Sequence, residues 1–208
     1  MKQFSKNTNI ILIALLFIFI AVFVIFSGSL VTTFDESLLT HIFGLRNDQF
    51  TPIVTWVTDL LAPINIILTV TIMSLFIYLS KQSWGLSLWY ASVHIVGLLI
   101  LNPGLKAIVE RNRPPIDFRL VQETSPSFPS GHSASVVLVS LMIAFTLIHI
   151  FNLTKYKHII ISFALVFILF IGFTRMYLGV HYFTDVIAGY LVGLFSFGLG
   201  LKAYKNFF

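Results

Sequence analysis

Long apolar runs separated by short polar segments dominate the pattern of hydrophobic and polar residues along this chain. A helix that crosses a bilayer needs about 20 consecutive, mainly apolar residues. Six stretches approach this length, at residues 9–27, 60–79, 84–101, 133–151, 159–173 and 186–201. The pattern therefore predicts an all-α, integral membrane protein in which six transmembrane helices form one bundle.

The first apolar run follows Lys2 and Lys6, as the core of a secretory signal peptide would. It is longer than an ordinary signal-peptide core, and no A-x-A cleavage site follows it. We therefore expect this run to remain in the protein as an uncleaved first helix.

The polar segment between the first two runs has a helical pattern at residues 35–44. Its apolar positions are Leu38, Leu39, Ile42 and Phe43, and its polar positions are Asp35, Glu36, Thr40 and His41. This pattern is typical of a short amphipathic helix that lies in the membrane interface. An ordinary connecting loop with one helical turn fits the pattern equally well.

The composition agrees with a membrane protein and excludes several other classes. Of the 208 residues 57% are hydrophobic and 10% are charged, and the mean hydropathy is +0.94, which excludes a disordered chain. No linker or repeat separates the runs, so we expect one membrane domain over residues 1–208. Without cysteine the chain has no disulfide and no thiolate metal site. The net charge of +5 is dispersed, which argues against a nucleic-acid partner.

The charged residues are distributed asymmetrically about the predicted membrane. If the N-terminus is cytoplasmic, seven lysines and no acid lie inside: Lys2, Lys6, Lys81, Lys155, Lys157, Lys202 and Lys205. The eight acids and the other six cations lie outside or at the outer ends of helices. This asymmetry follows the positive-inside rule. We therefore predict a multi-pass protein of the cell membrane with both termini in the cytoplasm.

Three polar clusters interrupt the apolar pattern, and all three fall on the predicted outer face. They are Lys106-x6-Arg113-Pro114, Pro129-Ser130-Gly131-His132 and Arg175-x5-His181-x3-Asp185. Ionisable groups are costly near hydrocarbon and by default mark a functional site. We therefore place the candidate active site on the outer face.

The cations in the first and third clusters are suited to a phosphate ligand. A phosphomonoester carries about −1.5 to −2 charges near pH 7, and Lys106, Arg113 and Arg175 offer matching donors. Ser130 can cap the helix that follows and Gly131 allows close backbone approach, so this turn can add N–H donors. The alternatives are interfacial anchoring for the cations and simple helix capping for Ser130.

The two histidines can supply acid–base and nucleophilic chemistry. His181 and Asp185, four residues apart, share one face of a helix, so the carboxylate can accept from Nδ1–H and direct Nε2 toward phosphorus. His132 would then protonate the leaving alkoxide, and water would hydrolyse the phosphohistidine. The alternative for Asp185 is an ordinary first-turn acid. A two-metal site would need more clustered carboxylates, so we expect neither metal nor cofactor.

The three clusters resemble the signature of the type-2 phosphatidic acid phosphatases, which share their site with the vanadium haloperoxidases. The chain departs from the signature once, because Thr174 stands where the family usually has Ser. The resemblance implies a metal-independent lipid phosphatase in which His181 is the nucleophile, His132 the general acid and Asp185 the residue that orients His181. It also implies that Lys106, Arg113 and Arg175 bind phosphate.

These observations together predict a lipid phosphatase that works on the outer leaflet. The short chain is similar to bacterial members of the family, which favours phosphatidylglycerophosphate or phosphatidic acid as substrate, with undecaprenyl pyrophosphate as the alternative. A lipid phosphotransferase would use the same residues, whereas a non-catalytic lipid-binding protein would not need them all. The Gly189-x3-Gly193 pattern favours close helix packing and leaves the oligomeric state open.

Overall fold

The computed structural model describes residues 2–26 and 29–208, and these residues form helices and connecting segments without strands. The long elements are α1 (Lys2–Phe26), α2 (Ser29–Phe43), α3 (Thr51–Asp59), α4 (Pro63–Lys81), α5 (Trp84–His94), α6 (Asn102–Val109), α7 (Gly131–Phe145), α8 (Lys157–Tyr177) and α9 (Phe183–Phe207). The π-helical η1 (Ile95–Leu101) joins α5 to α6, and η3 (Thr146–Ile150) extends α7. Two single turns, η2 (Ile116–Phe118) and η4 (Thr154–Tyr156), lie in connections. The predicted all-α fold is confirmed.

Five helical runs are long and apolar enough to cross a bilayer. They are Pro63–Lys81, Trp84–Val109, Gly131–Ile150, Thr154–Tyr177 and Phe183–Phe207. A sixth candidate combines Ile10–Ile25 with Leu30–Phe43, whose axes differ by 95°. The predicted end of the first span, at residue 27, lies outside the described residues. These runs agree with the predicted integral membrane fold of six spans.

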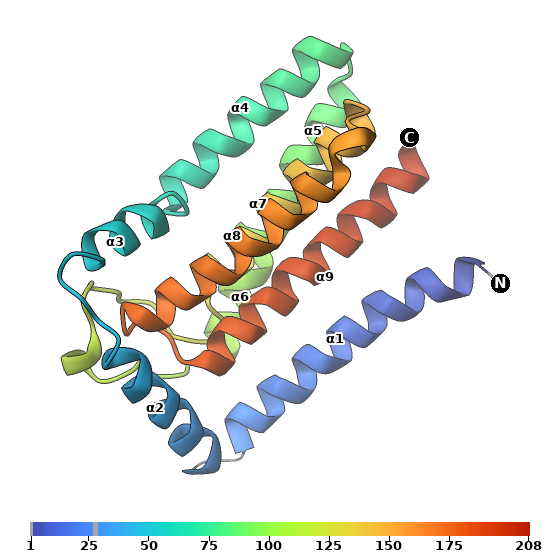
Figure 1. The fold of residues 1–208 in the computed structure, drawn as a ribbon. Helices are drawn as coiled ribbons and strands as arrows, with labels where there is room; N and C mark the ends of the chain where they lie inside the picture. Colours follow the sequence, from blue (N-terminus) through green and yellow to red (C-terminus); the bar gives the residue numbers. More distant parts are fainter. Residues whose placement is uncertain (1, 27–28) are drawn as a thin grey trace.

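The long helices lie side by side, with both termini at one end of the bundle (Figure 1). At the other end lie α2, α3 and the long connection between α6 and α7 (Figure 1). Helix α7 is central and packs against both α8 and α9, whereas α1 packs on α9 and α4 packs on α5. Nine of the 15 residues of α7 are buried, but only Ile77 is buried in α4. The N-terminus of α7 is therefore held firmly at the site end of the bundle.

The exposed surface of the long helices is strongly apolar. Ile72 on α4 is 64% exposed and Phe163 on α8 is 73% exposed, and similar residues continue along both helices. Contiguous apolar surface of this extent is rare on soluble monomers. It suits contact with the hydrocarbon of a bilayer, where the helices satisfy their own backbone groups.

Two glycines allow α9 to lie close against α7. A Cβ atom at Gly189 would lie 2.4 Å from the carbonyl oxygen of Ser130, and one at Gly193 would lie 2.6 Å from that of Ala134. The Gly189-x3-Gly193 pattern therefore serves helix packing within the chain. The contact also brings the start of α7, with the second polar cluster, against the first turns of α9, with the third.

Candidate active site

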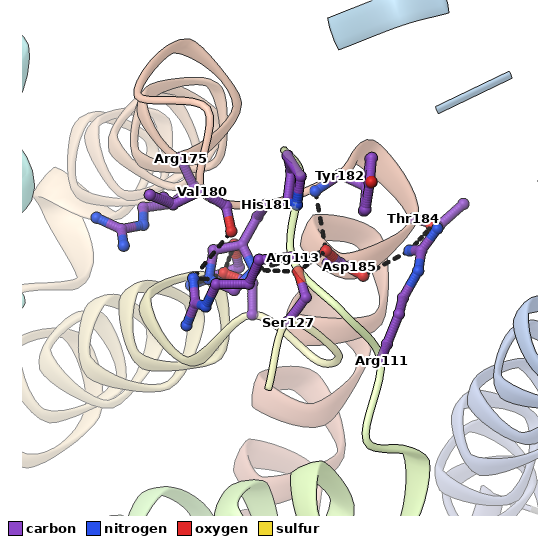
Figure 2. Close-up of polar contacts among 12 residues, drawn as sticks. Arg111, Arg113, Ser127, Arg175, Val180, His181, Tyr182, Thr184 and Asp185 are labelled. Carbon is purple, nitrogen blue, oxygen red and sulfur yellow. Dashed lines mark hydrogen bonds and ion pairs between the residues drawn. The ribbon is translucent and has the colours of Figure 1, made fainter. Parts of the chain in front are cut away.

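The three polar clusters meet at the end of the bundle that is opposite to the two termini. Figure 2 shows groups from the first and third clusters pointing toward one another. A cavity of about 870 Å³ opens here, and its lining includes Lys106, Arg113, Gly131, His132 and His181. The fold therefore joins residues that are up to 75 positions apart in sequence.

The first cluster begins on a helix and ends in an extended segment. Helix α6 ends at Val109 because Glu110 adopts a left-handed backbone conformation, with φ of 47°. The helix therefore ends before Pro114 and Pro115. Beyond it, Arg113 is anchored by hydrogen bonds to the carbonyl oxygen (2.7 Å) and the hydroxyl (3.1 Å) of Ser125. These bonds hold its guanidinium at the mouth of the cavity.

Lys106 lies one turn before the end of α6 and lines the cavity. Its ammonium group donates to the carbonyl oxygen of Pro126, in the segment that precedes the second cluster. The lysine is therefore directed toward the site and away from the membrane surface, unlike a simple interfacial anchor.

The second cluster forms the turn into α7. Ser130 caps this helix, as predicted, and its hydroxyl accepts from the backbone N–H of Ser133 at 3.4 Å. The N–H of Ser130 donates to the carbonyl oxygen of Asp185 at 3.0 Å, so this donor is already bonded. Gly131 and His132 line the cavity, and they are the members of this turn that a ligand can reach.

His181 lies in the short connection between α8 and α9 and is 1% exposed. Its Nδ1 lies 3.6 Å from Oδ2 of Asp185, which is too long for a direct hydrogen bond. The hydroxyl of Ser127 lies between them, 3.3 Å from Nδ1, and donates to Oδ2 at 2.5 Å. The predicted His181–Asp185 pair is therefore present at ion-pair distance, with Ser127 as a bridge (Figure 2).

The neighbours of His181 determine its tautomer. Nη1 of Arg113 lies 3.3 Å from Nε2, and because a guanidinium can only donate, Nε2 must accept. The proton of neutral His181 then resides on Nδ1, which faces Ser127. Burial lowers the pKa of His181 to about 3, although Asp185 acts in the opposite direction. His181 is therefore neutral near pH 7, and its lone pair lies on Nε2, where Arg113 is its neighbour.

Asp185 is fully buried and lies in the first turn of α9. Its Oδ2 accepts from the backbone N–H of Tyr182 at 2.8 Å, and its Oδ1 accepts from Nη1 of Arg111 at 2.6 Å. Asp185 therefore caps the helix, as the simpler interpretation of the sequence held, and also faces His181. The two interpretations are compatible because Oδ2 both accepts from the N–H of Tyr182 and faces His181, while Oδ1 is bonded to Arg111.

Arg175 is 2% exposed, and its contact with the residues that line the cavity is an ion pair with Glu123. Its Nη2 forms a 2.6 Å ion pair with Oε1 of Glu123, whose Oε2 lies 3.5 Å from Nη2 of Arg113. The preceding residue, Thr174, bonds through its hydroxyl to Thr58 (3.2 Å) and to the carbonyl oxygen of Ile171. The structure thus places Glu123 between two cations.

The motifs did not identify four residues that the structure places in the network: Asp35, Arg111, Glu123 and Ser127. Arg111 and Ser127 each lie two residues before a motif residue, Arg113 and Pro129, and a hydrogen bond of 2.8 Å joins their backbones. Their nearness to the motifs was the only sequence signal. Asp35 had no such signal and was expected on the polar face of an interfacial helix, but it is fully buried.

The donor set of the cavity suits an anion. Across residues 2–26 and 29–208, no group of three His, Asp or Glu side chains is arranged to hold a metal ion. Lys106, Arg113, His132 and His181 face the cavity at this end, and charge-assisted bonds from cations to phosphate oxygens are strong. The remaining walls are apolar and come largely from α4 and α5, with Ile66, Val70 and Leu98 among them.

Three comparisons relate this chain to known proteins. Residues 87–208 match the model of the PAP2 superfamily. The chain is 34% identical over 169 residues to phosphatidylglycerophosphatase B of Bacillus subtilis (strain 168), which covers 79% of this chain and 80% of that protein.

Two solved structures have a similar fold. The crystal structure of the first transmembrane PAP2 type phosphatidylglycerolphosphate phosphatase, from Bacillus subtilis, matches with a TM-score of 0.87 and 30% identity, over 96% of this chain and 97% of that one. The crystal structure of Aquifex aeolicus LpxE matches with a TM-score of 0.62 over 81% of this chain and 95% of that one. At 22% identity the second likeness concerns the fold alone.

Proposed function

The chain belongs to the PAP2 superfamily, and from this premise we propose that it is an integral membrane lipid phosphatase with a histidine nucleophile. One observation carries the proposal. A single cavity holds Lys106, Arg113, His132 and His181 at one end and continues between apolar walls. Such a cavity suits a molecule with an anionic phosphate and an apolar tail. The unit of function is one membrane domain over residues 1–208.

The proposed reaction begins with attack of Nε2 of His181 on phosphorus. As the P–N bond forms, the P–O bond to the lipid breaks, and His132 gives its proton to the leaving alkoxide. Water then attacks the phosphohistidine while His132 takes up a proton, which releases inorganic phosphate and restores both histidines. The hydrogen bonds around Nδ1 support this role, because they leave the Nε2 lone pair as the reactive one.

Lys106, Arg113 and Arg175 are the proposed phosphate ligands. Preorganised cations stabilise the charge that spreads over the equatorial oxygens of a transferring phosphoryl group. Arg113 already lies beside Nε2 of His181, so the same guanidinium can bond a phosphate oxygen at the point of attack. Gly131 completes the proposed cradle at the start of α7, the helix that Ser130 caps.

The apolar walls support a lipid substrate. They extend along α4 from Pro63 to Tyr78, which corresponds to about 22 Å of helix at 1.5 Å per residue. The relative at 34% identity is named a phosphatidylglycerophosphatase, so phosphatidylglycerophosphate is the favoured substrate, with phosphatidic acid next. Undecaprenyl pyrophosphate, with a longer apolar tail, is the alternative.

The active site is proposed to face the outer leaflet, with both termini in the cytoplasm. Lys81 ends α4, Lys157 begins α8 and Lys202 lies near the end of α9, and these helix ends lie at the end of the bundle that carries the termini (Figure 1). The acidic residues Asp35, Asp59 and Asp185 lie on α2, at the end of α3 and at the start of α9, toward the site end. This distribution supports the orientation because cytoplasmic segments of membrane proteins are enriched in lysine and arginine.

The test is phosphate release by detergent-purified protein in excess EDTA. The panel holds phosphatidylglycerophosphate, phosphatidic acid and undecaprenyl pyrophosphate, and the variants are His181→Ala and, as the matched control, His41→Ala on exposed α2 surface. We expect release by the wild type and the control, and a loss of about 10³-fold or more in His181→Ala. Release from none of the lipids, or undiminished release by His181→Ala, would overturn the proposal. Transfer to an acceptor alcohol would identify a phosphotransferase.

A further inference from the structure

The guanidinium of Arg111 lies between two buried carboxylates. Nη1 is 2.6 Å from Oδ1 of Asp185, and Nη2 is 2.7 Å from Oδ2 of Asp35. Both acids are fully buried, and they come from helices at opposite ends of the chain, α2 and α9. Because Arg111 lies outside the lining of the cavity, this interaction is separate from the proposed phosphate ligands.

Further contacts fix the Arg111 side chain in one geometry. Thr184 accepts from Nη1 at 2.8 Å and itself donates to Asp35 from its hydroxyl (2.5 Å) and its backbone N–H (3.2 Å). The guanidinium also lies over the ring of Tyr182, 4.3 Å from its centre. A planar guanidinium that is hydrogen-bonded along its edge and stacked on its face has little freedom to rotate. The ammonium group of a lysine could not make the same set of contacts.

This fixed guanidinium determines how Asp185 faces His181. With Oδ1 bonded to Arg111, the carboxylate must present Oδ2 to Ser127, Tyr182 and His181. Without Arg111, a fully buried carboxylate would lose its nearest cation and would tend to rotate or to take up a proton. A protonated or rotated Asp185 would no longer hold the proton of His181 on Nδ1.

We propose that Arg111 and Asp35 are positioning residues for the phosphatase reaction. Arg111 orients Asp185, and Asp35 holds Arg111 in place from α2. The inference rests on the proposed function, because it assigns these residues to the reaction of His181. Neither residue is expected to touch the substrate, so their removal should lower kcat and leave substrate binding nearly unchanged. Helix α2 therefore helps to position the catalytic residues, because it carries Asp35.

The experiment measures kcat, KM and vanadate inhibition for Arg111→Gln, Asp35→Asn and the double variant in detergent. Asp48→Asn, an exposed acid in the same outer segment, is the matched control. We expect kcat to fall about 10²-fold in Arg111→Gln, the effect of a small misplacement of a catalytic group. KM and the vanadate inhibition constant should stay within about threefold of the wild type in all variants.

Two further readouts separate positioning from general support of the fold. If Asp35 acts through Arg111, the double variant should be no slower than Arg111→Gln alone, because effects of coupled residues are not additive. Added guanidinium ion should restore part of the kcat of Arg111→Ala but should not change that of Asp48→Asn. Asp35→Asn, which keeps the Arg111–Asp185 pair, provides the test if the Arg111 variants do not fold.

The possible results separate this inference from the proposed function. Wild-type protein that releases no phosphate from any lipid would overturn both. An active wild type whose Arg111→Gln and Asp35→Asn variants keep their kcat would overturn only the positioning role. A rise in KM at constant kcat would also overturn it, because Arg111 would then act in substrate binding.

Discussion

The carboxylate of Glu123 lies where it balances the charge of two proposed phosphate ligands. It pairs with Arg175 at 2.6 Å and approaches Arg113 at 3.5 Å, while its own side chain is 27% exposed toward the cavity. A bound phosphate would share these guanidinium groups with a carboxylate, whose charge has the same sign. We therefore expect Glu123 to weaken anion binding in the site while it bridges the two arginines.

The Glu123→Gln variant tests this balance. Glutamine keeps the shape but removes the negative charge, so vanadate should bind more tightly. We expect the inhibition constant to fall about threefold to tenfold, since one partly exposed charge contact contributes about 1 kcal/mol. Glu36→Gln, on the exposed surface of α2, should leave the constant unchanged. Weaker inhibition of Glu123→Gln would show that Glu123 supports the anion site.

The protonation of His181 gives a second prediction at this scale. Burial lowers its pKa far below the usual 6.5, so the neutral form should persist as the pH falls from 8 to 5. Nitrogen NMR of protein with labelled histidine, assigned with His181→Asn, should show Nδ1 protonated and Nε2 bare over this range. A titration midpoint above about 7 would contradict the proposed neutral nucleophile, because more than half of the imidazole would then be protonated at pH 7.

The motif residues could be found from sequence because their chemistry and spacing are distinctive. Ser127 and Arg111 could not be assigned, since their partner Asp185 is 58 and 74 residues away and only the fold brings them together. Asp35 was the hardest case. Its helical pattern predicted that Asp35 lies on an exposed polar face, but Asp35 lies on the buried face of α2 with Leu39 and Ile42, where it pairs with Arg111.

At the scale of elements, the contact between α7 and α9 joins the second and third clusters. Gly189 and Gly193 make this contact possible, because side chains there would collide with the backbone of Ser130 and Ala134. The N–H of Ser130 then reaches the carbonyl oxygen of Asp185. The position of His132 relative to His181 thus depends on two glycines that take no part in the proposed reaction.

Gly189→Ala should therefore impair both stability and activity. Overpacking at such a contact costs about 1–3 kcal/mol, which lowers the thermal midpoint of a chain of this size by about 2–12 °C. The kcat should fall as the Pro-Ser-Gly-His turn moves. Gly104→Ala is the matched control, because a Cβ atom there meets nothing within 4 Å. Equal thermal midpoints and rates for the two variants would refute the role of close packing.

The ends of helices were the least predictable elements. The spans predicted at residues 159–173 and 186–201 correspond to α8 (Lys157–Tyr177) and α9 (Phe183–Phe207). Hydropathy stops short of Arg175 and Asp185, but both are in helices because buried partners satisfy their charges. The apolar interiors were predictable, whereas charged helical turns depend on partners that sequence patterns do not identify.

At the scale of the whole molecule, the charge distribution predicts the orientation in the membrane. The chain has no cysteine, so a single introduced cysteine can be labelled without background. In intact cells, a membrane-impermeant maleimide should label Asp48→Cys near the site but not Lys157→Cys at the opposite end. Lys157→Cys should react only after permeabilisation, and the reverse pattern would place the active site in the cytoplasm.

The central claim is that His181 carries the phosphoryl group, and trapping that intermediate tests it most directly. Protein in excess EDTA would be mixed with phosphatidylglycerophosphate labelled at its terminal phosphorus, quenched within milliseconds in alkali, and digested for mass spectrometry. The account predicts an acid-labile, alkali-stable phosphoryl group on the peptide that contains His181, and none in His181→Ala. A phosphoryl group on another residue, or full turnover by His181→Ala, would contradict it.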